Sequence, residues 1–251
     1  MKIDESRFVA HRGYASKYPE NTLLAMSKAI EAGAYFLECD IQLTLDHVPL
    51  LHHDPDIKRS TGRRGTVMDL TFEELSDFSF GEPARFGEKF AKTPITTLKD
   101  IAGLLSKNPN VQLFVELKEE SICRFGAGVM LNVIVDTLKP VIDQCIAISF
   151  DENAVMEAKK WGFKKTGWVL RRWNNKSRKI TEALSPDYIF GNYKKIKEAD
   201  DSLWKGPWKW ALYEITDSSL AIKWFKLGAD MVETMEIGEM LDAFKKEAGN
   251  A

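Results

Sequence analysis

Apolar and polar positions follow two alternating patterns along this chain. Short apolar runs, typical of buried strands, alternate with longer stretches in which apolar residues recur at helical spacing. Eight alternations of strand and helix in 251 residues predict an α/β fold of the (β/α)8 class, a TIM barrel. The alternative is an open doubly wound sheet, which is disfavoured because no glycine-rich phosphate turn follows the first strand. The predicted core strands begin near residues 8, 36, 111, 146, 167, 188, 210 and 231.

One additional strand interrupts this alternation. The strand at residues 36–43 is followed closely by a second apolar run at residues 48–51. A parallel crossover needs a dozen or more residues, so the second run is expected to fold back as a β-hairpin. In that hairpin Asp40 is expected to face His53, to within one or two residues.

Residues 56–95 differ in composition from the rest of the chain, because they are rich in glycine, proline and charged residues. We expect a small insertion there that covers one end of the barrel and contains a short helix near residues 72–78. The alternating pattern resumes at residue 97. The sequence therefore predicts one barrel domain over residues 1–251 with an insertion at about residues 56–95.

Composition and charge narrow the possible functions. Hydrophobic residues make up 44% of the chain, which is enough for a sizeable core. The formal net charge of −2 does not indicate a nucleic-acid-binding surface. The three cysteines, at positions 39, 123 and 145, have no metal-ligand spacing, so we expect reduced thiols in the core.

The acidic amino terminus, residues 1–6, has no signal-peptide core, and the chain contains no run of 18 apolar residues. We therefore expect a cytoplasmic protein without stable membrane insertion. The oligomeric state is left open by the sequence.

Glu38, Asp40 and Gln42 occupy alternate positions on the strand at residues 36–43, so their side chains project from one face. Two carboxylates on a mostly apolar strand resist burial unless positive charge lies between them. A divalent cation would supply that charge. The alternative is an exposed edge strand with a solvated acidic face.

Further polar residues stand at strand ends, where the active sites of such barrels lie. His11 and Arg12 end the first strand, Glu116 and Lys118 share a face at the end of the third, and the hairpin returns His53 to the same region. Singly, each residue has a structural alternative; Lys118, for instance, could simply neutralise Glu116. Together they are hard to explain as packing.

A third carboxylate, Glu116, would join Glu38 and Asp40 in an oxygen-rich site suited to Mg²⁺ or Ca²⁺. Zinc is less suitable because carboxylates outnumber the histidine ligands.

The chemistry that fits this set is phosphodiester cleavage. The cation, Arg12 and Lys118 would stabilise charge on the phosphate. His11 and His53 would act as general base and general acid, because an unperturbed histidine titrates near neutral pH.

These residues belong to an ordered series of motifs that resembles the series of glycerophosphodiester phosphodiesterases. Weaker similarity continues to the end of the chain. The motifs are His11-Arg12-Gly13, Pro19-Glu20-Asn21-Thr22, Glu38-x-Asp40-x-Gln42-x-Thr44, His53-Asp54-Pro55 and Glu116-x-Lys118.

The resemblance implies a (β/α)8 barrel in which residues 56–95 are the small insertion of the family. It also implies hydrolysis of small-molecule glycerophosphodiesters to sn-glycerol 3-phosphate and an alcohol such as choline or ethanolamine. The implied roles are a divalent metal, Mg²⁺ or Ca²⁺, held by Glu38, Asp40 and Glu116, an acid–base pair of His11 and His53, and phosphate contacts from Arg12 and Lys118.

The chain departs from the family pattern at three places. His47 stands in the hairpin turn where many members have glycine, so we expect a positive φ or a shifted turn there. A segment that usually reads like Trp-Thr-Val-Asn begins here with Tyr213 and Glu214, and the usual Thr-Asp at a strand end is Thr234-Met235. The last two changes lie on the substrate side in the family pattern, so they bear on the preferred alcohol.

Two other functions remain possible on the same barrel. A phospholipase D-like enzyme acting on sphingomyelin or lysophospholipid shares a similar histidine and carboxylate set, but those secreted enzymes usually carry a signal peptide and disulfides. A non-catalytic barrel that binds phosphate esters is disfavoured because every acid–base and metal residue is retained.

A group of aromatic residues near the end of the chain could enclose a quaternary ammonium or could simply pack in the core. The group consists of Trp204, Trp208, Trp210 and Tyr213.

Overall fold

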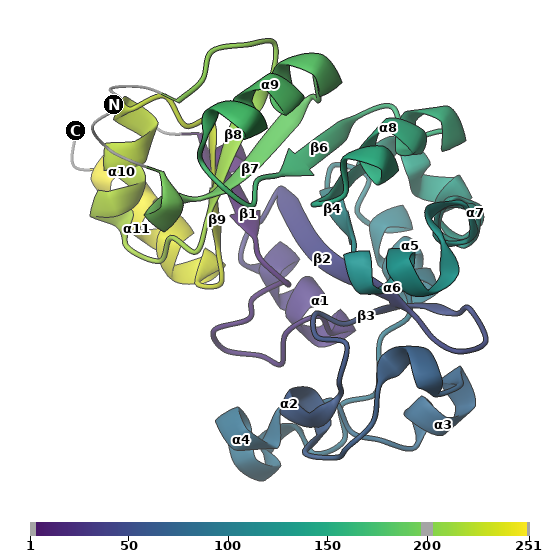
Figure 1. Ribbon diagram of the computed structural model, residues 1–251. Helices are drawn as coiled ribbons and strands as arrows, with labels where there is room; N and C mark the ends of the chain where they lie inside the picture. The colour runs from purple at the N-terminus through teal and green to yellow at the C-terminus, as the bar shows by residue number, and fades with distance from the viewer. Residues whose placement is uncertain (1–3, 197–202, 250–251) are drawn as a thin grey trace.

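Eight parallel strands close into a barrel in the computed structural model, which describes residues 4–196 and 203–249 (Figure 1). The first strand pairs with both the second and the last, so the sheet has no open side in this ring. The predicted (β/α)8 barrel is confirmed. The ring consists of β1 (Phe8–Ala10), β2 (Phe36–Leu43), β4 (Gln112–Leu117), β5 (Cys145–Ser149), β6 (Thr166–Val169), β7 (Tyr188–Asn192), β8 (Lys209–Tyr213) and β9 (Met231–Thr234).

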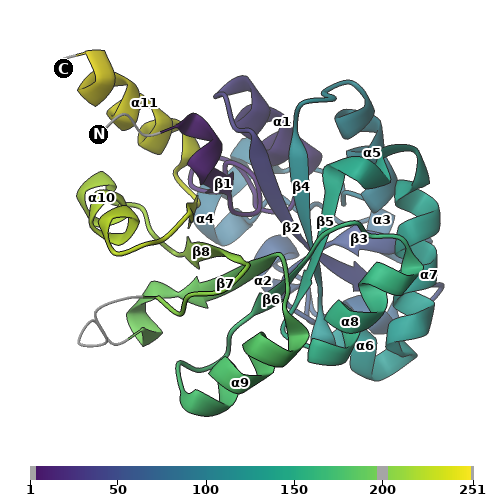
Figure 2. The same ribbon diagram turned by 90° about the horizontal axis from the view of Figure 1, so that it is seen from above.

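Helices surround this ring on the outside (Figure 2). Their starts follow from local sequence: the Thr22 hydroxyl accepts a hydrogen bond from the Ala25 amide, and Thr97 and Asp100 form a reciprocal capping box. The α-helices are α1 (Leu23–Glu31), α5 (Leu98–Ser106), α6 (Glu119–Phe125), α7 (Ala127–Leu138), α8 (Glu152–Trp161), α9 (Asn175–Leu184), α10 (Ser218–Lys226) and α11 (Ile237–Gly249). Short 3-10 helices occur at Glu5–Arg7, Lys139–Gln144 and Tyr193–Lys195.

Alternation along the strands divides the core into two parts. One set of side chains packs inside the barrel, and the other set packs between the strands and the helices. The inner set is apolar through most of its depth and includes Val9, Phe114, Phe190, Ala211 and Met231. Polar side chains replace apolar ones at the carboxyl ends of the strands, so the pocket described below has an apolar floor.

The predicted β-hairpin is present, with β3 (Pro49–Leu51) antiparallel to β2, and its register differs by one residue from the predicted pairing, within the margin of one or two residues. Gln42 pairs with Leu50, and Asp40 accepts a backbone hydrogen bond from His52 at 3.0 Å instead of facing His53. Residues 44–48 form the turn of this hairpin. Within it His47 has a φ of 62°, the positive value expected at a position where glycine is common. His53 therefore lies just beyond the strand pairing.

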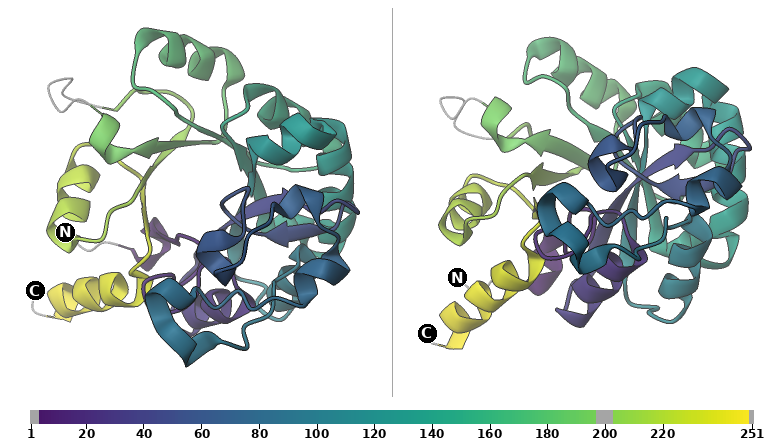
Figure 3. Two further views of the ribbon diagram at one scale, coloured as in Figure 1. Left: turned by 60° about the horizontal axis from the view of Figure 1, so that its bottom comes forward. Right: turned by 90° about the horizontal axis from the view of Figure 1, so that it is seen from below.

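The segment at residues 56–95 folds into short helices below α1 and β3 at one end of the barrel (Figures 1 and 3). Its apolar side chains pack with Leu50 of β3 in a separate cluster, whose members from the segment are Ile57, Val67, Leu75, Phe80 and Ile95. Its helices are α2 (Lys58–Thr61), α3 (Phe72–Ser76) and α4 (Pro83–Phe86), with 3-10 turns at Val67–Asp69 and Gly87–Phe90.

The cysteines only partly follow their prediction. Cys39 and Cys145 are buried free thiols, whereas Cys123 is exposed, so its expected place in the core is wrong. Cys123 lies on α6, a helix that the sequence did not predict, and the turn of this helix directs it outward.

Within the described part of the chain, no single helix is long and apolar enough to cross a membrane. One pair of helices, Glu119–Phe125 and Ala127–Gln144, meets the length and composition criteria when counted together, although the pair is bent by 113°. Residues 1–3 of the acidic amino terminus lie outside the described residues.

Candidate active site

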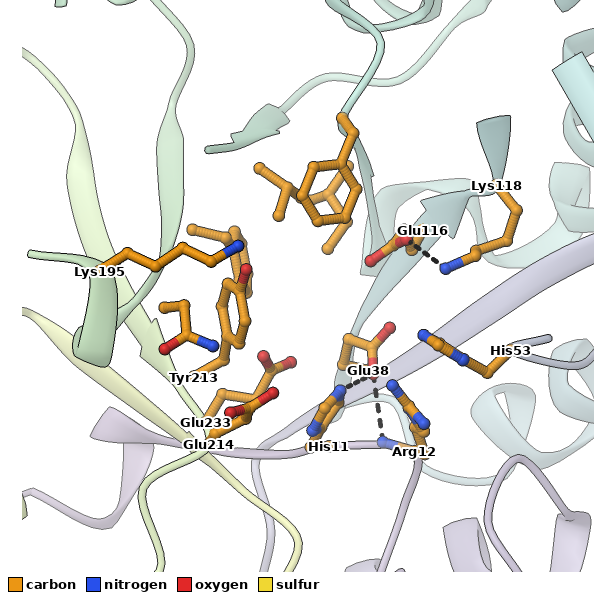
Figure 4. Close-up of a pocket in the computed structure, with 15 residues that line it drawn as sticks. His11, Arg12, Glu38, His53, Glu116, Lys118, Lys195, Tyr213, Glu214 and Glu233 are labelled. Atoms are coloured by element: carbon orange, nitrogen blue, oxygen red, sulfur yellow. Dashed lines mark hydrogen bonds and ion pairs between the residues drawn. The ribbon is translucent and has the colours of Figure 1, made fainter. Parts of the chain in front are cut away.

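A pocket of about 220 Å³ opens at the carboxyl ends of the strands (Figure 4). Six of the seven predicted site residues line it, and the seventh, Asp40, is buried beside them and forms ion pairs with two of the six. Its position at this end of the ring is where the active sites of such barrels lie. The six lining residues are His11, Arg12, Glu38, His53, Glu116 and Lys118.

Strand register brings three carboxylates together at the wall of this pocket. Asp40 on β2 is the register partner of Glu116 on β4, and Glu38 lies two residues earlier on the same face of β2. One oxygen of each lies within 4.8 Å of the others. Glu38 and Asp40 are each only 1% exposed, so the alternative of a solvated edge strand is wrong.

This carboxylate group is suited to a hard divalent cation. The buried Oε1 atom of Glu38 has no hydrogen-bond partner among the described residues, which leaves one oxygen available as a ligand. Carboxylate oxygens are the preferred protein ligands of Mg²⁺ and Ca²⁺. Glu38, Asp40 and Glu116 could therefore hold one such ion.

The pKa values of these carboxyl groups reflect their crowding. Burial, with the neighbouring Asp40 carboxylate, raises the pKa of Glu38 well above its ordinary value and that of Glu116 to about 7. For Asp40 the balance is reversed: burial opposes ionisation, but the Arg12 guanidinium and the Lys118 ammonium hold its pKa below the ordinary value. Extra positive charge is needed before all three carboxylates can ionise together.

Two basic side chains form the cationic part of the pocket. Arg12 Nε lies 3.1 Å from Asp40 Oδ2, and its Nη1 lies 2.9 Å from Glu20 Oε1. Lys118 Nζ lies 3.0 Å from Glu116 Oε1 and 3.3 Å from Asp40 Oδ1. Both side chains are positioned by carboxylates and also line the open space, so they can contact an anion there.

His11 follows β1 directly, and its backbone amide donates to the Thr234 carbonyl at 2.9 Å. Its Nε2 atom lies 3.8 Å from Glu38 Oε2, and its Nδ1 atom has no hydrogen-bond partner among the described residues. Burial, assisted by the positive charge of Arg12, lowers the pKa of His11 to about 3. The imidazole is therefore neutral near pH 7 and able to accept a proton.

His53 enters the pocket from the end of the hairpin. Its Nδ1 atom lies 2.7 Å from Asp54 Oδ1, and Arg59 Nε donates to Asp54 Oδ2 at 2.6 Å. A carboxylate at Nδ1 fixes that nitrogen as the donor and leaves Nε2 as the second functional atom of the ring. Asp54, the second residue of the His53-Asp54-Pro55 motif, thus orients the histidine.

Several polar residues support this arrangement from behind. Asn21 donates to Asp40 Oδ2 at 2.8 Å and accepts from the Asp40 amide at 3.2 Å. Gln42 accepts a hydrogen bond from Ser121 Oγ at 2.6 Å and donates to the His53 carbonyl at 3.4 Å. Gln42 therefore braces the loop that carries His53.

Sequence reasoning did not include Glu233 in the site. Glu233 lies on β9, is 3% exposed and lines the same pocket as His11. Nitrogen and oxygen atoms of His11, Glu38 and Glu233 lie within 4.8 Å of one another. The signal in the sequence was a single carboxylate inside the otherwise apolar run that begins at Met231.

The tryptophans of the aromatic group do not enclose the pocket. Trp173 and Trp204 stack at 4.1 Å between ring centroids, and the Trp210 indole donates to the Trp204 carbonyl at 2.9 Å. Trp208 and Trp210 belong to the core between strands and helices. Of this group, Tyr213 lines the pocket.

Comparisons with known proteins agree with this geometry. The model of the glycerophosphoryl diester phosphodiesterase family matches residues 11–125. A glycerophosphodiester phosphodiesterase of Caldanaerobacter subterraneus is 41% identical over 97 residues, which cover 39% of this chain and 39% of that protein. The Bacillus altitudinis enzyme is 35% identical over 121 residues, which cover 48% of each chain. The matched segments thus span less than half the length of these curated relatives.

Solved structures extend the similarity over the whole barrel. Glycerophosphodiester phosphodiesterase of Thermotoga maritima superposes with a TM-score of 0.75 at 26% identity, covering 96% of this chain and 99% of that one. An Oleispira antarctica phosphodiesterase, solved with its product sn-glycerol-3-phosphate, shares the fold with a TM-score of 0.82 at 22% identity, covering 95% of this chain and 96% of that one. The chain is therefore similar to glycerophosphodiester phosphodiesterases in the sequence of residues 11–125 and in the fold of the whole barrel.

Proposed function

We propose that this protein is a metal-dependent phosphodiesterase that hydrolyses small glycerophosphodiesters to sn-glycerol 3-phosphate and an alcohol. The observation that carries the proposal is the convergence of three carboxylates, two basic side chains and two histidines on one pocket. Its volume of about 220 Å³ suits a small substrate. Support also comes from relatives named for this activity and from the Oleispira enzyme, which was solved with sn-glycerol-3-phosphate.

In this proposal Glu38, Asp40 and Glu116 hold one divalent cation, Mg²⁺ or Ca²⁺. When bound, the ion supplies Lewis-acid stabilisation of charge on the phosphoryl oxygens. It also provides the positive charge that lets Glu38 and Glu116 ionise in spite of their raised pKa values.

Arg12 and Lys118 bind the phosphate oxygens in the same proposal. Both cations are already oriented by Asp40, so they lose little conformational freedom when the substrate arrives. Their fixed charges stabilise the phosphorane-like transition state more than the ground state, because negative charge accumulates on the equatorial oxygens.

His11 and His53 are the proposed acid–base pair. His11, kept neutral by burial, accepts the proton of the attacking oxygen. That oxygen belongs either to water, which gives glycerol 3-phosphate directly, or to the neighbouring glycerol hydroxyl, which gives a cyclic phosphate that water then opens. His53, oriented by Asp54, donates a proton to the departing alcohol oxygen. In this proposal the barrel and residues 56–95 form a single domain that carries the active site.

The test is a coupled assay for release of glycerol 3-phosphate from several glycerophosphodiesters, with and without chelator. We expect turnover that is lost in EDTA, restored by Mg²⁺ or Ca²⁺, and abolished in His11→Ala with the fold intact by circular dichroism. Activity that resists the chelator would remove the metal from the mechanism. Full activity of His11→Ala would remove His11 from its role, and phosphate-ester binding without turnover would favour the non-catalytic alternative.

A further inference from the structure

The pocket has two sides of different charge (Figure 4). One side carries Arg12 and Lys118, the proposed phosphate contacts. The other side, across His11 and Glu38 in the figure, carries Tyr213 from β8, Glu233 from β9 and Glu214 just after β8. A diester that places its phosphate on the first side therefore extends its remaining half toward two carboxylates.

Glu233 is an unusual residue for its position. Its register partner on β1 is Val9, which packs in the apolar interior of the barrel, so an aliphatic side chain would suit this place. Glu233 is instead a carboxyl that is 3% exposed, and its Oε1 atom has no hydrogen-bond partner among the described residues. A buried carboxylate of this kind is stable only when a partner satisfies it.

The protein surroundings of Glu233 do not provide a dedicated cation. Burial raises its pKa well above the ordinary value, and the nearby carboxylates of Glu116, Asp40 and Glu214 add to this effect against the opposing charge of Arg12. Arg12 already forms ion pairs with Asp40 and Glu20. A positive group that enters with the substrate would relieve this excess of negative charge.

The neighbours of Glu233 fit an organic cation. Glu214 lies at the rim, 44% exposed at its side chain, where its Oε2 atom is 3.4 Å from Lys194 Nζ. Tyr213 offers an aromatic face, and Phe150 and Phe190 contribute apolar wall to the same pocket. Carboxylates beside aromatic and apolar surfaces are the setting in which ammonium groups are bound.

One cation of the protein, Lys195, also lies on this side of the pocket. Its side chain extends over Tyr213 toward the pocket, and its Nζ atom donates to the Arg171 carbonyl at 3.5 Å. Lys194 pairs with Glu214 at the rim, whereas Glu233 has no ion-pair partner among the described residues, so Glu233 is the uncompensated carboxylate on this side.

We infer that Glu233, assisted by Glu214 at the rim, is a specificity-determining residue that binds an ammonium group on the alcohol half of the diester. This inference rests on the proposed function and adds selectivity to it: diesters of amino alcohols are preferred to diesters of neutral alcohols. The charge pattern of such a substrate, anionic at the phosphate and cationic at the alcohol, matches the two sides of the pocket.

The test compares glycerophosphocholine with its uncharged isostere, in which the alcohol is 3,3-dimethylbutan-1-ol and carbon replaces nitrogen. For the wild type we expect kcat/KM to be about tenfold or more higher for the choline ester, as for a desolvated cation beside a carboxylate. In Glu233→Gln the ratio of the two kcat/KM values is expected to fall toward one. Glu236→Gln, a partly buried carboxylate three residues later and outside the pocket, is the matched control and should keep the wild-type ratio.

The outcomes separate this inference from the proposed function. Equal kcat/KM values for the two esters in the wild type, with glycerol 3-phosphate released from both, overturn the inference alone. Failure to release glycerol 3-phosphate from any diester overturns the proposed function. A metal analysis that finds two divalent ions per wild-type chain and one in Glu233→Gln makes Glu233 a metal ligand, which also overturns the inference.

A second measurement covers the case in which Glu233→Gln does not fold. Inhibition of the wild type by choline is compared with inhibition by 3,3-dimethylbutan-1-ol, with glycerophosphoglycerol as substrate. We expect choline to inhibit at an about tenfold lower concentration, because only choline carries the positive charge. Equal inhibition constants contradict the inference.

Discussion

Asp40 and Glu116 are register partners on the adjacent parallel strands β2 and β4, and the ammonium group of Lys118 lies within 3.3 Å of Asp40 and 3.0 Å of Glu116. Neighbouring side chains on one face of a sheet are close enough for two carboxylates to repel each other. Lys118 compensates one of these charges. A bound divalent ion would compensate the rest, so metal binding would be coupled to stability at this pair.

The first prediction concerns that coupling. Addition of millimolar Mg²⁺ or Ca²⁺ to chelator-treated protein should raise the melting temperature, because a ligand at 100 times its Kd stabilises the folded state by about 2.7 kcal/mol. In Glu38→Gln the shift should be largely lost, since one of the three ligands is missing. Differential scanning calorimetry measures the effect. Glu88→Gln, an exposed carboxylate of the insertion, is the control, and a shift that persists in Glu38→Gln contradicts the proposed ligand set.

The second prediction concerns Lys118. Lys118→Met should lower kcat/KM by about a hundredfold or more, since loss of one donor to a developing oxyanion typically costs 10²–10³-fold in rate. It should also weaken ionisation of Glu116, because Lys118 lowers the pKa of that group. Steady-state kinetics test the rate, and Lys107→Met, at an exposed lysine, is the control. If Lys118→Met keeps the wild-type kinetics, Lys118 does not stabilise the transition state, and Arg12 alone of these two residues binds the phosphate.

The third prediction concerns pH and His52, which is buried against Ser60 with 2.8 Å between Nε2 and Oγ. Burial lowers the pKa of His52 below its ordinary value of 6.5. Below pH 6.5 the unfolded chain therefore binds a proton that the folded chain does not, so the free energy of unfolding falls as the pH is lowered. The contribution of one such group is at most about 1.4 kcal/mol for each pH unit.

Urea unfolding of wild type and His52→Asn at pH 7, 6 and 5 measures this effect. The variant should show the shallower loss of stability with falling pH. Parallel pH profiles for the two proteins would mean that His52 titrates alike in both states.

The fourth prediction concerns Ser121 behind the pocket. Its hydroxyl donates to Gln42 Oε1 at 2.6 Å and accepts from the Leu43 amide at 3.0 Å, and the residue is fully buried. Ser121→Ala should lower the free energy of unfolding by about 1–3 kcal/mol, because two buried polar groups lose their partner. Urea denaturation measures this loss. Ser76→Ala, at an exposed serine, should change stability by less than about 0.5 kcal/mol.

Much of the site could be predicted from the sequence because its signals are local. Alternation on one strand places Glu38 and Asp40 on the same face, whatever the rest of the chain does. The count of strands and helices predicts the barrel, and a barrel collects its strand ends at one mouth. These two facts are sufficient to bring Glu116 and Lys118 near the acidic strand.

Other features depended on geometry that spacing does not contain. The hairpin register differs by one residue from the predicted pairing of Asp40 with His53 because residues 44–48 all lie in the turn, where His47 adopts a positive φ. The helix α6, which places Cys123 at the surface, begins immediately after a strand and has no apolar periodicity strong enough to predict it.

Periodicity and residue type in the sequence were sufficient to predict the barrel and a set of residues with the chemistry for a phosphodiester. The place of Glu233 in the pocket could be seen only in the folded chain. Its place depends on how β9 closes against β1, which turns a carboxylate in an apolar strand toward His11 rather than toward a helix. Closure of the ring joins residues far apart in the sequence, and local patterns carry no information about which faces then meet.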